Sequence, residues 1–130
     1  MEHVFRAIVF AAMLITSGLS FAQNDLCSTF LEYERNTNKK LPSQVDGATE
    51  IIQVRVNCEL KIISYVMRFT RDESELASGW QERKARQHQQ LHCNNNGLAS
   101  QAQWSARTVL HSTDGLKMLS EFMTRPSDCK

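Results

Sequence analysis

Residues 51–70, IIQVRVNCELKIISYVMRFT, decide the fold, because this run has the most sustained β-branched and aromatic content in the chain. Its first half alternates polar and apolar residues, which is the period of a half-buried strand. The apolar positions there are Ile52, Val54 and Val56. In the second half Tyr65 and Phe69 fall on one side, so we expect both in the core. The few residues around Cys58 suit a tight turn, and the run therefore predicts a β-hairpin.

Two other segments predict helices. The first follows a polar cap at Asn24 or Asp25 and ends at the asparagine-rich residues 36–38. Its apolar positions are Leu26, Phe30 and Leu31. The second covers residues 73–93 and opens with a capping-box pattern at Asp72. Each helix precedes or follows the hairpin closely, so each is placed to cover its apolar face.

A second hairpin is predicted near the end of the chain, with strands over residues 103–111 and 116–124. The turn signal between them is Asp114-Gly115. The order helix–hairpin–helix–hairpin predicts a small α+β domain of the α-β-β-α-β-β type. Its simplest form is a four-stranded antiparallel sheet with both helices on one face, stapled by disulfides.

Residues 1–22 have the parts of a secretory signal peptide. Arg6 precedes the apolar run 7–15, and small residues end the segment at Ser20-Phe21-Ala22. The apolar run is short for a membrane span, so an uncleaved anchor is the less favoured alternative. We expect cleavage after Ala22, one domain over residues 23–130, and no transmembrane segment after cleavage.

The chain has four cysteines, all within the expected mature part. An even number in an exported chain predicts two disulfides, although four cysteines allow three connectivities. No C-x-x-C occurs, so a zinc knuckle or a thioredoxin-like pair is not indicated. We favour Cys27–Cys58 and Cys93–Cys129, because each pair would clip a helix to the hairpin nearest in sequence.

His88 and His92 are the candidate metal ligands, since two histidines four apart on a helix share a face. The glutamate of a zincin motif is missing, because Gln89 follows His88. The alternative is a pair of solvent-facing histidines. No G-x-S-x-G elbow, glycine-rich phosphate loop or other cofactor motif occurs, so the residues indicate no cofactor and do not favour an enzyme.

Arg83, Lys84 and Arg86 are the candidate partner-binding residues. The formal net charge is only +1, and loss of Glu2 and Arg6 with the signal peptide leaves it unchanged. This balance disfavours nucleic acid as a partner. The cations form either a solvated helix face or a contact for an anionic partner surface or lipid headgroup.

Several short motifs follow one another in the mature chain: an LP-x-x-VD-x-x-T start, a paired-strand middle, a Cys-Asn at a helix end and a terminal Asp-Cys. They are Leu41-Pro42, Val45-Asp46, Thr49, residues 60–69, Cys93-Asn94 and Asp128-Cys129. The pattern resembles that of small exported proteins of Gram-negative bacteria, and departs from it where Ser105, Arg107 and Val109 replace alternating aromatic residues. Such proteins are often found beside secretion or conjugation functions, which implies an accessory role.

These observations favour a periplasmic binding or accessory protein that acts through protein–protein contact with an envelope partner. The contact would serve a conjugation or secretion apparatus, or neutralise a toxin. One alternative is a metal-binding protein or metal-dependent enzyme using His88 and His92. Another is a structural subunit of an envelope assembly. The residues do not set the oligomeric state or identify the partner.

Overall fold

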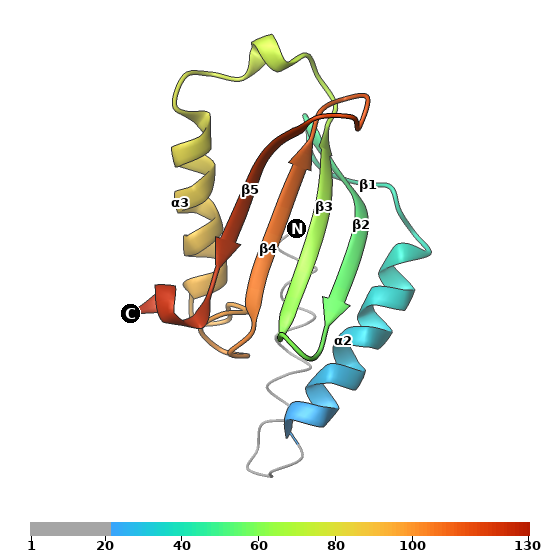
Figure 1. Cartoon of the computed structure of the whole chain (residues 1–130), viewed down its shortest axis with the longest axis vertical. Helices are drawn as coiled ribbons and strands as arrows, with labels where there is room; N and C mark the ends of the chain where they lie inside the picture. The colour runs from blue at the N-terminus through green and yellow to red at the C-terminus, as the bar shows by residue number, and fades with distance from the viewer. Residues whose placement is uncertain (1–21) are drawn as a thin grey trace.

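The computed structural model describes residues 22–130, so residues 1–21 of the expected signal peptide lie outside the described residues. Cleavage after Ala22 stays a prediction. The elements in chain order are α2 (Ala22–Asn38), β1 (Ser43–Asp46), β2 (Thr49–Asn57), β3 (Ile62–Phe69), η1 (Glu73–Glu75), α3 (Trp80–Cys93), β4 (Ser105–His111), β5 (Met118–Thr124) and η2 (Pro126–Cys129). Helix α2 lies beside β2 and helix α3 lies beside β5 (Figure 1). None of the helices in this part of the chain is long and apolar enough to cross a membrane.

The sheet is five-stranded and mixed, so the predicted four-stranded antiparallel sheet is wrong. Both predicted hairpins are present, and the strands lie in the order β1-β2-β3-β4-β5. Strands β3 and β4 are parallel, because α3 carries the chain back to the end of the sheet where β3 began. The extra strand β1 pairs with the start of β2. It contains one apolar residue, Val45, and therefore gives no periodic signal.

The second predicted helix is also corrected. The capping box of Asp72 and Glu75 forms, but it opens only the single 3-10 turn η1. The main helix α3 begins at Trp80, after Gly79 takes a left-handed conformation with φ of 76°. A left-handed residue breaks the helical path, and so one predicted helix becomes two elements.

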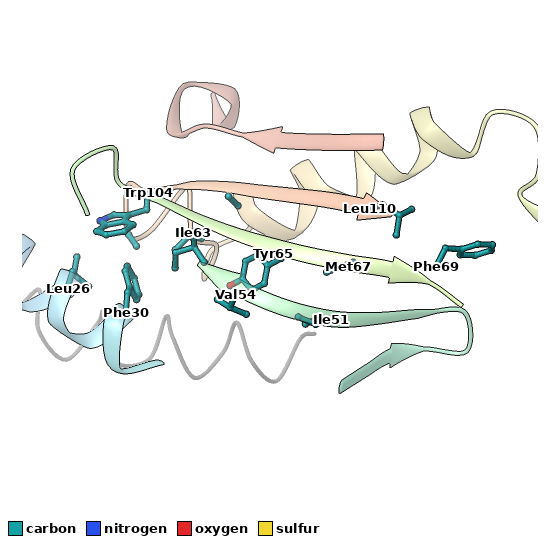
Figure 2. Packing of buried hydrophobic residues seen from close by; sticks show 13 residues of the cluster. Leu26, Phe30, Ile51, Val54, Ile63, Tyr65, Met67, Phe69, Trp104 and Leu110 are labelled. Atoms are coloured by element: carbon teal, nitrogen blue, oxygen red, sulfur yellow. The ribbon is translucent and has the colours of Figure 1, made fainter. Parts of the chain in front are cut away.

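The core lies on one face of the sheet (Figure 2). Tyr65 and Phe69 are 0% and 6% exposed, which confirms their prediction as core residues. Helix α2 contributes Phe30, whose ring meets Trp104 edge-on at a centroid distance of 4.8 Å. Leu26 and Phe30 are buried as the helical stripe predicts, whereas Leu31 is 39% exposed.

Helix α2 also covers part of the edge of β2 with polar side chains. The carboxamide of Asn38 donates from Nδ2 to the Val54 carbonyl and accepts from the Val54 N–H, both at 2.9 Å. The Glu34 carboxylate accepts from the Val56 N–H. These side chains give β2 the bonds that a neighbouring strand would give, and an edge covered in this way resists pairing with other chains.

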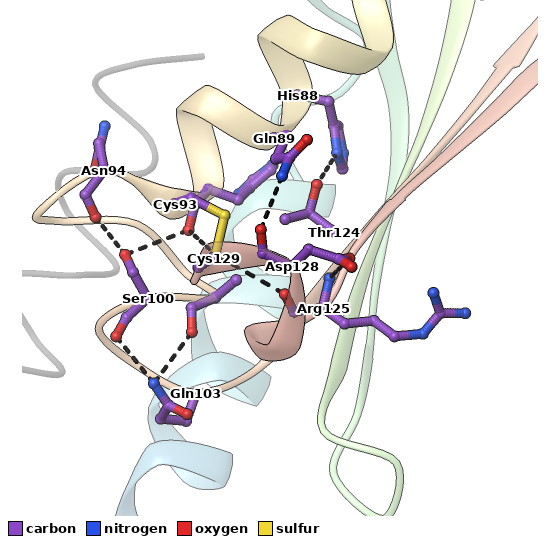
Figure 3. The surroundings of a disulfide bond; sticks show 12 residues. His88, Gln89, Cys93, Asn94, Ser100, Gln103, Thr124, Arg125, Asp128 and Cys129 are labelled. Carbon is purple, nitrogen blue, oxygen red and sulfur yellow. Dashed lines mark hydrogen bonds between the residues drawn. A yellow bond between two sulfur atoms is a disulfide. The ribbon is translucent and has the colours of Figure 1, made fainter.

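Two disulfides tie the helices to the sheet. Cys27–Cys58 joins α2 to the β2–β3 turn, and Cys93–Cys129 joins the end of α3 to η2. They are the pairings expected from the sequence. Gln89 on α3 strengthens the second junction by donating to the Asp128 carbonyl at 2.8 Å (Figure 3). The C-terminal tail is therefore held against α3.

Candidate functional site

A cleft of about 440 Å³ lies between α3, the core face of the sheet and β1. Its apolar lining is Val45, Met67, Leu91, Leu110 and Phe122. Its polar lining is Asp46, Thr49, Lys84, Gln87, His88, Gln90, Asn94 and Thr108. An apolar floor with a few convergent polar groups is the usual composition of a binding site. We therefore treat this space, called the α3 cleft below, as the candidate site.

Two further hollows have linings that are mainly polar. One, of about 520 Å³, lies beside the Cys93–Cys129 disulfide. The other, of about 420 Å³, lies between Asp72-Glu73 and the β4–β5 turn. Neither lining includes a large aliphatic or aromatic side chain, so neither could bury an apolar ligand group as the α3 cleft could.

His88 sits at the wall of the α3 cleft and joins three elements. Its Nδ1 lies 2.7 Å from Thr124 Oγ1 on β5, and its Nε2 lies 3.0 Å from Thr108 Oγ1 on β4. In the neutral ring one nitrogen donates and the other accepts, and each hydroxyl can serve either role. Burial lowers the pKa of His88 to about 4, so the ring is neutral at neutral pH. The neutral imidazole thus connects α3 to β4 and β5 through two hydrogen bonds.

His92 lies one turn further along α3, with its ring centroid 4.5 Å from that of His88. Burial, together with the charge of the neighbouring His88 when that ring is protonated, lowers the pKa of His92 to about 3. Both rings are buried, so the alternative of two solvent-facing histidines is wrong. Within residues 22–130 no group of three or more His, Cys, Asp or Glu side chains could hold a metal ion. Metal binding by the pair stays a prediction, which zinc titration of the protein and of His92→Asn tests.

The three predicted partner-binding cations do not form one patch. Lys84 lines the α3 cleft, whereas Arg86 lines the hollow beside the Cys93–Cys129 disulfide. Arg83 turns back and donates from Nη1 to the Ser78 carbonyl at 2.8 Å. The sequence placed them together because they are close along the chain. Lys84 is one position from Arg83 and two from Arg86, however, and side chains at those spacings do not face each other on a helix.

Sequence reasoning missed the carboxamide groups on the α3 side of the cleft: Gln87, Gln90 and Asn94. The Gln87 and Gln90 side chains are exposed and make no hydrogen bond to any described residue. Asn94 uses Oδ1 to accept from the Asn96 N–H at 2.8 Å, which leaves its Nδ2 for another partner. The signal that could have found them is the interval of three and then four residues between them, which puts them on one side of the helix.

No protein-family model and no curated protein matches the chain. Two solved structures are similar to it. A "putative secreted protein" from Pseudomonas aeruginosa is 10% identical with a TM-score of 0.64, over 87% of this chain and 100% of that one. The pilotin EpsS of the Vibrio vulnificus type 2 secretion system is 14% identical with a TM-score of 0.62, over 83% of this chain and 94% of that one. At these identities the likeness shows a shared fold.

Proposed function

We propose that this protein is an exported accessory protein of the cell envelope that binds a segment of a partner protein in the α3 cleft. The observation that carries the proposal is the apolar floor beneath a polar rim, which the two other hollows described above lack. Two disulfides suit an oxidising compartment, and we place the protein in the periplasm.

The likeness in fold to a secreted protein and to a secretion-system pilotin supports a role beside a secretion apparatus. The resemblance of the sequence motifs to exported proteins found beside secretion or conjugation functions points the same way. Since conjugation also moves macromolecules through the envelope, we propose a transport apparatus of one of these kinds as the source of the partner.

The chemistry of the cleft favours binding over catalysis. A general base works best when its pKa lies near the operating pH, whereas burial lowers the pKa of His88 to about 4. Both nitrogens of this ring are already engaged by Thr108 and Thr124. An imidazole held in this way has a structural role. The side chains of Lys84, Gln87 and Gln90 make no hydrogen bond to a described residue and are left to contact a partner.

Site-specific photocrosslinking in the native host tests the proposal. Benzoylphenylalanine at position 87 should crosslink to an envelope protein, which mass spectrometry of the adduct identifies. The control position is Gln81, which lies on α3 but outside the cleft and contacts the Leu119 carbonyl. Crosslinks that form equally at 81 and 87, or only at 81, would show that the partner docks elsewhere.

Lys84 provides a second, smaller test of the same proposal. It is the cation of the predicted trio that lines the cleft, so Lys84→Gln should reduce the crosslink yield from position 87. An exposed charge contributes about 0–1 kcal/mol, and the reduction should be largest at low salt. Arg83→Gln and Arg86→Gln serve as matched controls. If these two reduce the yield as much as Lys84→Gln, the predicted cationic face acts as a unit outside the cleft.

A further inference from the structure

We infer that the α3 cleft binds an extended, uncharged peptide segment whose backbone is held by the carboxamides of Gln87, Gln90 and Asn94. This inference rests on the proposed function and names the kind of segment the partner supplies. Three observations support it: the chemistry of the rim, a similar contact made by Asn38 elsewhere in the molecule, and the composition and charge of the lining.

The rim presents the hydrogen-bonding groups of a peptide backbone. Each carboxamide carries a carbonyl acceptor and an N–H donor group, as a peptide unit does. Gln87, Gln90 and Asn94 follow one another at intervals of three and four residues, so they form a row along one side of α3. The side chains of Gln87 and Gln90 make no hydrogen bond within residues 22–130, and the Nδ2 group of Asn94 also makes none there. The row can therefore bond to a backbone laid beside it.

Helix α2 already contains a carboxamide that binds the backbone of an extended strand. On α2, Asn38 holds one residue of an extended strand through a donor and an acceptor at once, with both distances to the Val54 backbone at 2.9 Å. Gln87 and Gln90 carry the same functional group on α3, which lies beside β5 rather than β2. What Asn38 does for β2, these residues would do for an incoming strand.

The lining of the cleft suits such a segment. In an extended peptide every second side chain points to the same side, so alternate apolar residues would reach Met67, Leu110 and Phe122 on three adjacent strands. Lys84 and Asp46 are the single cation and single anion of the lining, so the cleft has no net charge to attract a charged ligand. A helical segment satisfies its own backbone groups and would leave the row of carboxamides without backbone partners.

Synthetic peptides test the inference on the mature protein with both disulfides intact. The extended probe is a blocked hexapeptide of alternating threonine and valine, and its matched control carries N-methyl groups on alternate residues. A blocked amphipathic helical peptide is the third probe. We expect the extended probe to shift the NMR signals of the Gln87 and Gln90 side-chain amides and of the Met67 methyl group. N-methylation should weaken binding about tenfold, as loss of one or two hydrogen bonds does.

A protein variant gives an independent readout. Gln87→Glu with Gln90→Glu keeps the size of both side chains but removes their donors, and should weaken the extended probe about tenfold. Gln81→Glu is the matched control outside the cleft and should leave the affinity unchanged. Equal affinity for the N-methylated peptide, tighter binding of the helical peptide in the cleft, or no shift of cleft signals with the extended probe would overturn the inference. The photocrosslink at position 87 reports on the proposed function separately, because it does not depend on the form of the bound segment.

Discussion

The two helices of this domain are held by different kinds of contact. Helix α2 buries Leu26 and Phe30 in the core and fills the edge of β2 with Asn38. Helix α3 buries no aliphatic or aromatic residue completely, and its buried side chains are His88 and His92. It is held by hydrogen bonds to threonines and by the disulfide at its end.

This difference explains where the cleft is. Apolar burial is non-directional and favours close packing of a helix against the sheet. Helix α2 packs in this way around Phe30, whose side chain is completely buried. Hydrogen bonds and a disulfide instead fix α3 at a set distance through a few points. Between α3 and the sheet, beside these contacts, an unfilled space remains, and this space is the α3 cleft. The helix with the poorer apolar stripe is thus the one that forms the binding site.

The largest expected effect comes from the apolar anchor of α2. Phe30→Ala should lower the free energy of unfolding by about 3–5 kcal/mol, because the ring is completely buried against Trp104. Leu31→Ala is the matched control on the same helix and should cost much less, since Leu31 is 39% exposed. Urea unfolding measures both. A small effect at Phe30 would mean that α2 is not held by apolar burial.

The next effect separates the two disulfides. Replacing Cys93 and Cys129 together by Ser should cost about 2–4 kcal/mol and should also raise hydrogen exchange throughout the last turns of α3. The same replacement of Cys27 and Cys58 should cost a similar amount of stability. It should leave the amides of α2 around Phe30 protected, because apolar packing still holds them. Equal loosening of both helices would break the comparison.

Acid should weaken α3 through its histidines. Because burial lowers the pKa of His88 to about 4, the unfolded chain binds more protons than the folded one below about pH 6.5. The contribution of the neutral ring is complete above pH 6.5 and is lost as the pH falls toward 4, with about 2 kcal/mol gone at pH 5. His88→Asn should reduce the slope of the stability profile between pH 7 and pH 5, and the slope that remains is that of His92. A variant with the slope of the wild type would show that the ring does not titrate with unfolding.

The smallest effect compares the same chemical group on the two helices. Asn38→Ala removes both bonds to Val54 and should cost about 1–2 kcal/mol, because it leaves two backbone groups at the strand edge without their partner. Gln87→Ala should change stability by less than about 0.5 kcal/mol, since its exposed carboxamide makes no hydrogen bond to a described residue. Thermal unfolding of the two variants measures the contrast. A loss at Gln87 as large as that at Asn38 would assign the cleft carboxamides a structural role.

The sequence determined what short-range patterns can encode. Both hairpins follow from apolar alternation and turn residues, and the burial of Tyr65 and Phe69 follows from the same alternation. The apolar spacing of Leu26 and Phe30 indicates the first helix, but the helix begins at Ala22, before the predicted cap at Asn24 or Asp25. The expected cysteine pairs match the structure because each helix packs against the hairpin that follows it in the chain. Cys27–Cys58 joins α2 to the β2–β3 turn, and Cys93–Cys129 joins α3 to η2, which follows β5.

Only the tertiary structure decided how these pieces meet. The direction of β4 beside β3 depends on the path of α3, and β1 gains its place from pairing with β2 rather than from any periodicity of its own. The sequence around His88 does not show that its side chain is buried, because its hydrogen-bond partners, Thr108 and Thr124, lie on two strands that are distant in sequence. The α3 cleft likewise joins residues of α3 to residues of distant strands. Contacts between distant segments depend on the packing of the whole chain, and a local pattern of residues carries no record of them.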